Sequence, residues 1–136
     1  MLSPTLDTVR LFLHVLAASV WVGGQIVLAG LVPSLKRAYP DSVKIAARAY
    51  AHVAWPAFAI VVVTGLWNLT EIDVTDTSTA YQITLFVKIS LAITSGAAAA
   101  THQLGRSKAA LAIGGALGLL GALGAMFCGY LLSTGA

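Results

Sequence analysis

Four ionisable side chains lie inside otherwise apolar stretches of the sequence, namely His14, His52, Lys88 and His102. A lysine at the centre of a membrane helix costs about 2.5–3.5 kcal/mol, so such groups commonly mark functional sites. A neutral imidazole is the commonest metal ligand in proteins. An ammonium group pairs with anions. We therefore expect His14 to ligate a metal, and Lys88 to bind an anionic group or to contribute to a metal centre.

The helical period groups further polar residues with these two. Helical spacing places Trp21 and Gln25 on one stripe with His14. The seven-residue spacing of Lys88, Ser95 and His102 places them on one helix face. We include all of these residues in the candidate cofactor site.

Each of these residues also has a simpler interpretation. Lys88 could extend its aliphatic stem towards the membrane interface. His14 could be a core histidine that is bonded to a neighbouring backbone or hydroxyl group. His52 and His102 could lie near the headgroups, or pair as a second ligand site at the opposite membrane level.

The composition indicates the elements that must position these residues. Of the 136 residues, 58% are hydrophobic and only 10% are charged, whereas a soluble domain carries about 25% charged residues. This excludes a soluble enzyme and a disordered tail. Apolar stretches long enough to cross a bilayer predict an all-α domain over residues 1–136, an antiparallel up-down bundle of four transmembrane helices. The predicted helices cover residues 6–35, 42–69, 79–104 and 108–133.

Residues that favour helix ends support these bounds. We expect Pro33 and residues 38–42 to close the first connection. Side chains suited to capping stand at the later ends, namely Asp41 or Ser42, Ser78 or Thr79, Gly105 and Ser107.

The basic residues predict the orientation in a cell membrane. The second connection carries only acidic charges, whereas basic residues flank the first and third connections. These basic residues are Lys36, Arg37, Lys44, Arg48, Arg106 and Lys108. We therefore expect connections one and three to be cytoplasmic, with both termini outside. No continuous basic patch exists, so nucleic acid is excluded as a partner.

The fourth helix carries small residues at steps of three or four, which allow close helix packing and a possible homo-oligomer contact. These residues are Gly114, Gly118, Gly121, Ala125 and Gly129.

Three segments resemble the copper resistance protein D (CopD) superfamily and, within it, the HemJ-type protoporphyrinogen IX oxidases. They are residues 11–24 (LFLHVLAASVWVGG), 56–67 (PAFAIVVVTGLW) and 85–89 (LFVKI). His102 matches a histidine near the end of the third helix of the HemJ-type proteins. Tyr81 stands where those proteins often have a tryptophan.

The resemblance implies a haem b-binding membrane protein that oxidises protoporphyrinogen IX or transfers electrons. His14 would ligate the iron. Lys88 would pair with a propionate or supply the opposite face. One alternative is a copper-handling or copper-transport protein. Copper(I) favours Met and Cys ligands, of which the chain has only Met1, Met126 and Cys128. Another alternative is a structural subunit of a larger membrane redox complex.

The orientation is testable with reporter fusions after Pro40 and Asp76. We expect a cytoplasmic reporter to be active at Pro40 and inactive at Asp76, because the basic residues flank the first connection. The opposite pattern would invert the topology and move Lys88 to the inner side.

Overall fold

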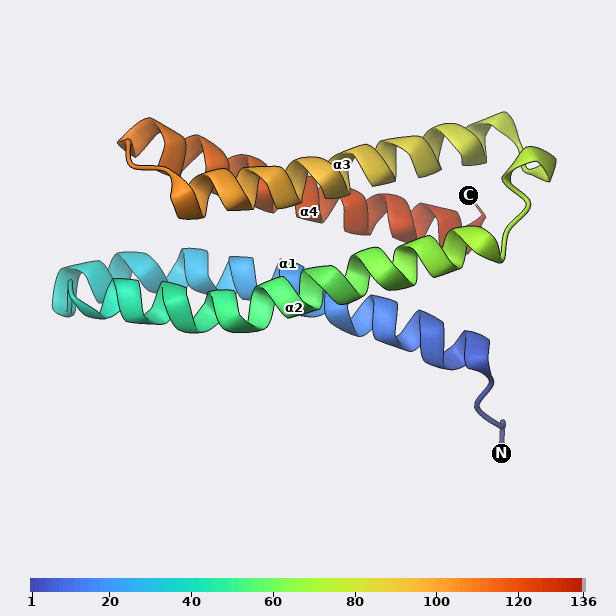
Figure 1. Ribbon diagram of the computed structural model, residues 1–136, viewed down its shortest axis with the longest axis horizontal. Coiled ribbons are helices and arrows are strands. Elements are labelled where there is room, and N and C mark those ends of the chain that lie inside the picture. Colours follow the sequence, from blue (N-terminus) through green and yellow to red (C-terminus); the bar gives the residue numbers. More distant parts are fainter. Residues whose placement is uncertain (136) are drawn as a thin grey trace. The chain divides into compact units, whose positions relative to one another are not determined.

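The computed structural model describes residues 1–135, which contain four long helices and no strand (Figure 1). The helices are α1 (Leu6–Ala38), α2 (Ser42–Thr70), α3 (Thr79–Leu104) and α4 (Lys108–Thr134), with a short 3-10 helix η1 (Val74–Asp76) before α3. Each of the four long helices is long and apolar enough to cross a membrane. The all-α class and the four predicted spans are therefore confirmed.

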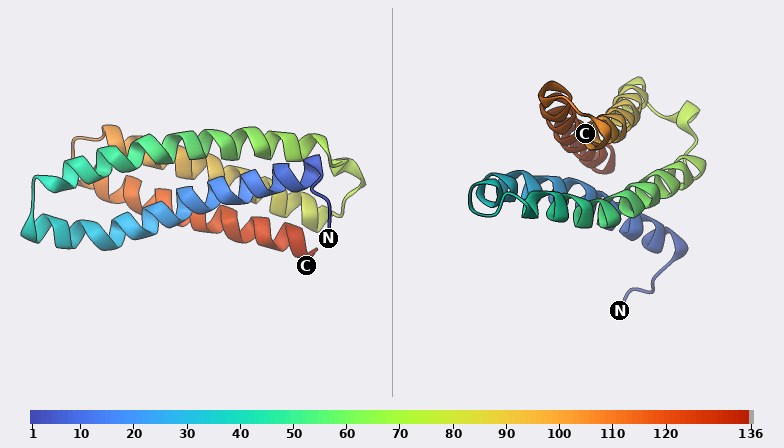
Figure 2. Two further views of the ribbon diagram at one scale, coloured as in Figure 1. Left: turned by 90° about the horizontal axis from the view of Figure 1, so that it is seen from below. Right: turned by 60° about the vertical axis from the view of Figure 1, so that its left-hand side comes forward.

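The expected domain comprises two compact units, which divide between Ile72 and Asp73. We call α1 with α2 the first hairpin, and α3 with α4 the second hairpin. In each hairpin a short connection joins two helices that run antiparallel, side by side (Figures 1 and 2). The predicted up-down order of neighbouring helices is thus present within each hairpin.

The first hairpin is held by an aromatic cluster. The buried ring of Trp21 in α1 lies 4.5 Å from Phe58 and 5.5 Å from Trp55, measured between ring centroids. Tyr50 of α2 donates a hydrogen bond from its hydroxyl to the Trp21 carbonyl at 3.2 Å. Its ring occupies the space that a side chain at Gly24 would need. Large rings and a facing glycine therefore fix the seam between α1 and α2.

The second hairpin is held by close backbone contact instead. A Cβ at Gly114 would lie 2.8 Å from the Ala98 carbonyl oxygen, and one at Gly121 would lie 3.0 Å from the Leu91 carbonyl oxygen. The small residues of α4 therefore pack against α3, as predicted. A contact between two copies of the chain stays a prediction, and it would need another face of α4.

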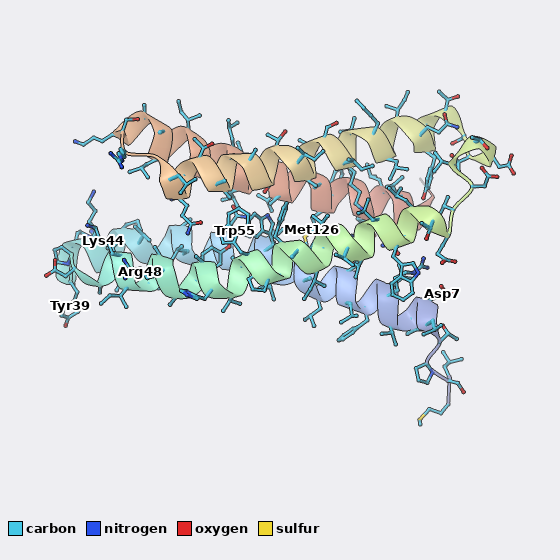
Figure 3. The ribbon with its side chains drawn as sticks, in the orientation of Figure 1. Asp7, Tyr39, Lys44, Arg48, Trp55 and Met126 are labelled. Carbon is cyan, nitrogen blue, oxygen red and sulfur yellow. The ribbon has the colours of Figure 1, made fainter. Side chains whose placement is uncertain are left out.

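The first connection begins later than expected. We expected Pro33 to help to close it, but Pro33 lies inside α1, which continues to Ala38. Lys36 and Arg37 stand in the last turn, where the negative end of the helix dipole stabilises positive charges. In Figure 3, Tyr39, Lys44 and Arg48 lie at this end of the first hairpin, and Asp7 lies at the other.

The capping predictions hold for α3 and α4 but not for the start of α2. Ser78 accepts a hydrogen bond from the Tyr81 N–H, and Ser107 accepts one from the Ala110 N–H. Asp41 is the N-cap residue of α2 but makes no side-chain capping bond. Gly105 is the C-cap of α3, where a Cβ would meet the Thr101 carbonyl oxygen at 2.6 Å. The need for glycine at Gly105 is therefore steric.

The acidic connection between the hairpins is stabilised locally. Asp73 caps η1, and its carboxylate accepts hydrogen bonds from the hydroxyl and the backbone N–H of Thr75. The bond from the hydroxyl, the largest cause, holds the pKa of Asp73 below its ordinary value. The carboxylate of Asp73 therefore stays charged at neutral pH.

The packing of the second hairpin predicts a large effect of Gly114→Ala. The added methyl would collide with backbone atoms of α3, so we expect a loss of about 1–3 kcal/mol in unfolding free energy. Gly30→Ala is the matched control, because nothing lies within 4 Å of a Cβ there. Thermal unfolding in one detergent measures both. A Gly114 variant as stable as the Gly30 variant would contradict the close packing.

Candidate functional site

The side chain of His14 is joined to α2 by a hydrogen bond to Thr64. His14 Nδ1 lies 2.8 Å from the hydroxyl oxygen of Thr64, which is buried. The same oxygen lies 2.6 Å from the backbone carbonyl oxygen of Ile60. A carbonyl only accepts, so the single proton of the Thr64 hydroxyl is directed to the α2 backbone. The hydroxyl therefore accepts from His14, and Nδ1 is the donor.

This bond assigns the tautomer of the imidazole. With the proton on Nδ1, a neutral His14 carries its lone pair on Nε2. Histidines that ligate metals almost always donate their other ring N–H to an oxygen, which fixes the orientation of the ring. A core histidine can also bond to a hydroxyl, so the bond alone identifies no ligand. It does place the proton of a neutral imidazole on Nδ1 and the lone pair on Nε2.

Gly65 lies beside the same ring. A Cβ at this position would stand 3.4 Å from His14 Cε1, an ordinary van der Waals contact. A larger side chain would press on the ring. Thr64 thus fixes the imidazole by a hydrogen bond, and the missing side chain of Gly65 leaves room beside the ring.

The other predicted residues of α1 are engaged within the first hairpin. Trp21 belongs to the aromatic cluster, and its carbonyl accepts from the Gln25 side-chain amide at 3.1 Å. Both residues therefore maintain the α1 backbone and the seam with α2. Their contact with a cofactor stays a prediction.

The predicted residues of α3 all approach α4. The half-buried Lys88 extends along Gly129, where a Cβ would lie 3.4 Å from its Nζ. Ser95 is 1% exposed and donates to the Gly118 carbonyl at 2.7 Å. His102 is exposed and donates from Nδ1 to the Leu111 carbonyl at 2.5 Å. This row lies on the face towards α4.

The expectation that His14 shares a membrane depth with Lys88, and His52 with His102, stays a prediction. His14 lies in the first hairpin and Lys88 in the second. His52 and His102 are likewise in separate hairpins. His52 donates from Nδ1 to the Arg48 carbonyl of its own helix at 2.7 Å, so it is anchored locally.

Sequence reasoning missed Thr64 and Arg10. Thr64 stands directly before Gly65 in the conspicuous TGLW segment, but its bond to His14 joins residues 50 positions apart. Arg10 is not among the predicted site residues. Its signal is its position four residues before His14, which places it on the same helix face.

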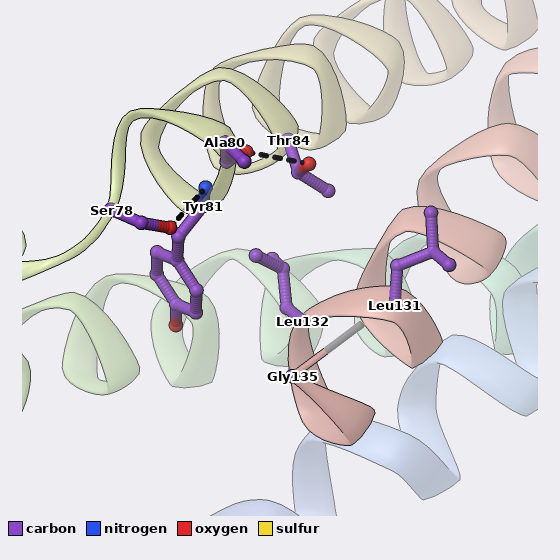
Figure 4. Close-up of a pocket in the computed structure, with 7 residues that line it drawn as sticks. All are labelled: Ser78, Ala80, Tyr81, Thr84, Leu131, Leu132 and Gly135. Carbon is purple, nitrogen blue, oxygen red and sulfur yellow. Dashed lines mark hydrogen bonds between the residues drawn. The ribbon is translucent and has the colours of Figure 1, made fainter.

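Two hollows lie within single hairpins. An apolar groove of about 300 Å³ follows α1 and α2 near Pro56, and His14 is not among its lining residues. Figure 4 shows a pocket of about 50 Å³ between the start of α3 and the end of α4, beside Tyr81 and Leu132. Small-molecule sites usually occupy about 300–1,000 Å³, so this second pocket is too small for a porphyrin.

Among residues 1–135, no group of three or more His, Cys, Asp or Glu side chains is placed to hold a metal ion. A haem iron needs only one or two protein ligands, so this criterion does not bear on a haem. No family model, no curated protein and no solved structure matches this chain.

The assigned tautomer predicts the effect of Thr64→Val. The substitution keeps the shape but removes the acceptor, so the fixed preference for a proton on Nδ1 should be lost. Nitrogen NMR of labelled His14 in detergent measures this. We expect a protonated Nδ1 and an unprotonated Nε2 in the wild type, and a mixture of tautomers in the variant.

Thr94→Val is the matched control, because Thr94 makes the same type of bond to its own helix, to the Ser90 carbonyl. It should leave the His14 signals unchanged, and Thr64→Ser should restore them. A wild-type His14 with its proton on Nε2 would overturn the assignment.

Proposed function

We propose that this chain is a membrane protein that binds haem b, with Nε2 of His14 as an axial ligand to the iron. The observation that carries the proposal is the bond from His14 Nδ1 to Thr64, because it leaves the lone pair on Nε2. The chemistry of this donor set fits a haem. One oriented imidazole in an apolar helix suffices for an axial ligand, whereas a free metal ion needs several protein ligands.

The resemblance of the first three helices to the CopD and HemJ-type proteins supports haem over other prosthetic groups. Haem would supply one-electron redox chemistry, and the chain would supply ligation, orientation and an apolar environment. Oxidation of protoporphyrinogen IX, or electron transfer to a separate acceptor, is the activity that this resemblance suggests.

Lys88 has the second role in this proposal. Its ammonium group is half-buried, and the flexible stem extends past Gly129. It would bind a propionate or face the haem opposite His14. We assign Trp21, Gln25, Ser95 and His102 supporting roles in the packing around the cofactor.

His14→Ala tests the proposal directly. We expect it to abolish haem binding while the protein still inserts, because α1 stays apolar and only the ligand is lost. His52→Ala is the matched control, because the hydrogen bond of His52 goes to the Arg48 carbonyl of its own helix. The haem-to-protein ratio after purification measures both variants. An unchanged Soret band in His14→Ala would exclude His14 as an axial ligand.

A second pair of variants separates the two levels. We expect Lys88→Ala to lower the haem content more than His102→Ala. His14 and Lys88 lie eight and nine residues after the starts of two helices that are both predicted to begin outside, so the two side chains should share one depth. The bond from His102 to Leu111 gives His102 a packing role within the second hairpin. Loss of haem in His102→Ala together with full retention in Lys88→Ala would move the site to the His52 and His102 level.

A further inference from the structure

Arg10 is a charged residue that is buried in the first hairpin. It is 7% exposed, in a part of α1 that lies one helical turn before His14. Its Nη2 donates to Asp7 at 3.0 Å, and its Cζ lies 5.9 Å from the centroid of the Trp67 ring.

The contacts of Arg10 leave much of its guanidinium unsatisfied. Its Nε and Nη1 atoms are buried without a hydrogen-bond partner, and so is Oδ1 of Asn68. A buried donor that makes no hydrogen bond costs about 1–3 kcal/mol, and more for a charged group. The ion pair with Asp7 compensates little, because the Asp7 side chain is 69% exposed and exposed pairs contribute at most about 1 kcal/mol.

These unsatisfied atoms belong to the same seam as His14. Arg10 and His14 are four residues apart on one face of α1, a rise of about 6 Å. On α2, Thr64 contacts His14, while Trp67 and Asn68 follow on the same face one turn later. Arg10 therefore lies one helical turn from the nitrogen ligand of the proposed cofactor, on the same face of α1.

We propose that Arg10 binds an anionic oxygen group at this end of the first hairpin, through one of the two guanidinium nitrogens that make no protein hydrogen bond, Nε or Nη1. A hydrogen bond from a guanidinium to a carboxylate or a phosphate is charge-assisted and therefore strong, and Trp67 lies on one side of the cation. The inference rests on the proposed function for the source of the anion. This source is a propionate carboxylate of the haem. A haem has two propionates, so a contact of one propionate with Arg10 is compatible with the role proposed for Lys88. A lipid phosphate offers the same chemistry.

The experiment compares haem b with its dimethyl ester, in which both propionates are neutral, on the full chain in detergent. The variants are Arg10→Gln, Asp7→Asn and the control Arg48→Gln, which alters an exposed arginine of the same hairpin. Arg10→Gln should weaken haem binding about 10- to 100-fold and should leave binding of the ester unchanged. Asp7→Asn should tighten haem binding, because it removes the carboxylate that competes for the guanidinium. Arg48→Gln should change neither.

A second arm identifies the source of the anion. Thermal unfolding is measured in vesicles of phosphatidylcholine and of phosphatidylglycerol. Stabilisation of the wild type by phosphatidylglycerol that is absent in Arg10→Gln would assign the site to a lipid phosphate. If the wild type binds no haem, the proposed function fails and this arm alone decides the anion site.

The inference is overturned if Arg10→Gln binds haem as tightly as the wild type does and the anionic lipid stabilises both equally. Haem binding by both proteins would then leave the proposed function intact. If Arg10→Gln does not fold, Asp7→Asn and the ester remain decisive. Equal affinity of the wild type and Asp7→Asn for haem and for the ester would exclude a carboxylate contact.

Discussion

The hydrogen bond from His14 to Thr64 fixes the orientation and the tautomer of the His14 ring in the first hairpin. It joins α1 to α2. His14 must be the donor in this bond, because the Thr64 hydroxyl already donates to the Ile60 carbonyl. The ring is thereby fixed by Thr64, with its lone pair on Nε2. The helix pair must keep this register for the imidazole to keep its orientation, so the aromatic cluster around Trp21 supports the site as well as the fold.

The two hairpins meet the same constraint with different side chains. Apolar burial provides little drive between helices in a bilayer, so association depends on close packing and on internal hydrogen bonds. The first hairpin uses the rings of Trp21, Trp55 and Phe58. The second hairpin uses glycines that bring α4 onto the α3 backbone, with the Ser95 hydroxyl donating to Gly118 across the contact. Ring packing thus holds the first hairpin, and close backbone contact holds the second.

Local sequence signals predict most of the helix bounds, because charge, apolar length and capping residues act over a few positions. Ser107 is such a signal, and it caps α4 as expected. The prediction that Pro33 helps to close the first connection is wrong. The long apolar helix α1 continues past this proline and has Lys36 and Arg37 in its last turn. The partners of the candidate site are harder to predict. The acceptor for His14 lies 50 residues away on another helix, and the unsatisfied nitrogens of Arg10 depend on burial in the folded hairpin.

The central claim is that this chain binds haem through the nitrogen that Thr64 leaves unprotonated. The most direct measurement is the absorption spectrum of the purified wild-type protein, together with its iron, copper and porphyrin content. The account predicts an intense Soret band with haem b bound in a stoichiometric amount. Two results would contradict it. One is colourless protein that carries stoichiometric copper, and the other is protein that holds neither copper nor haem after reconstitution with haem.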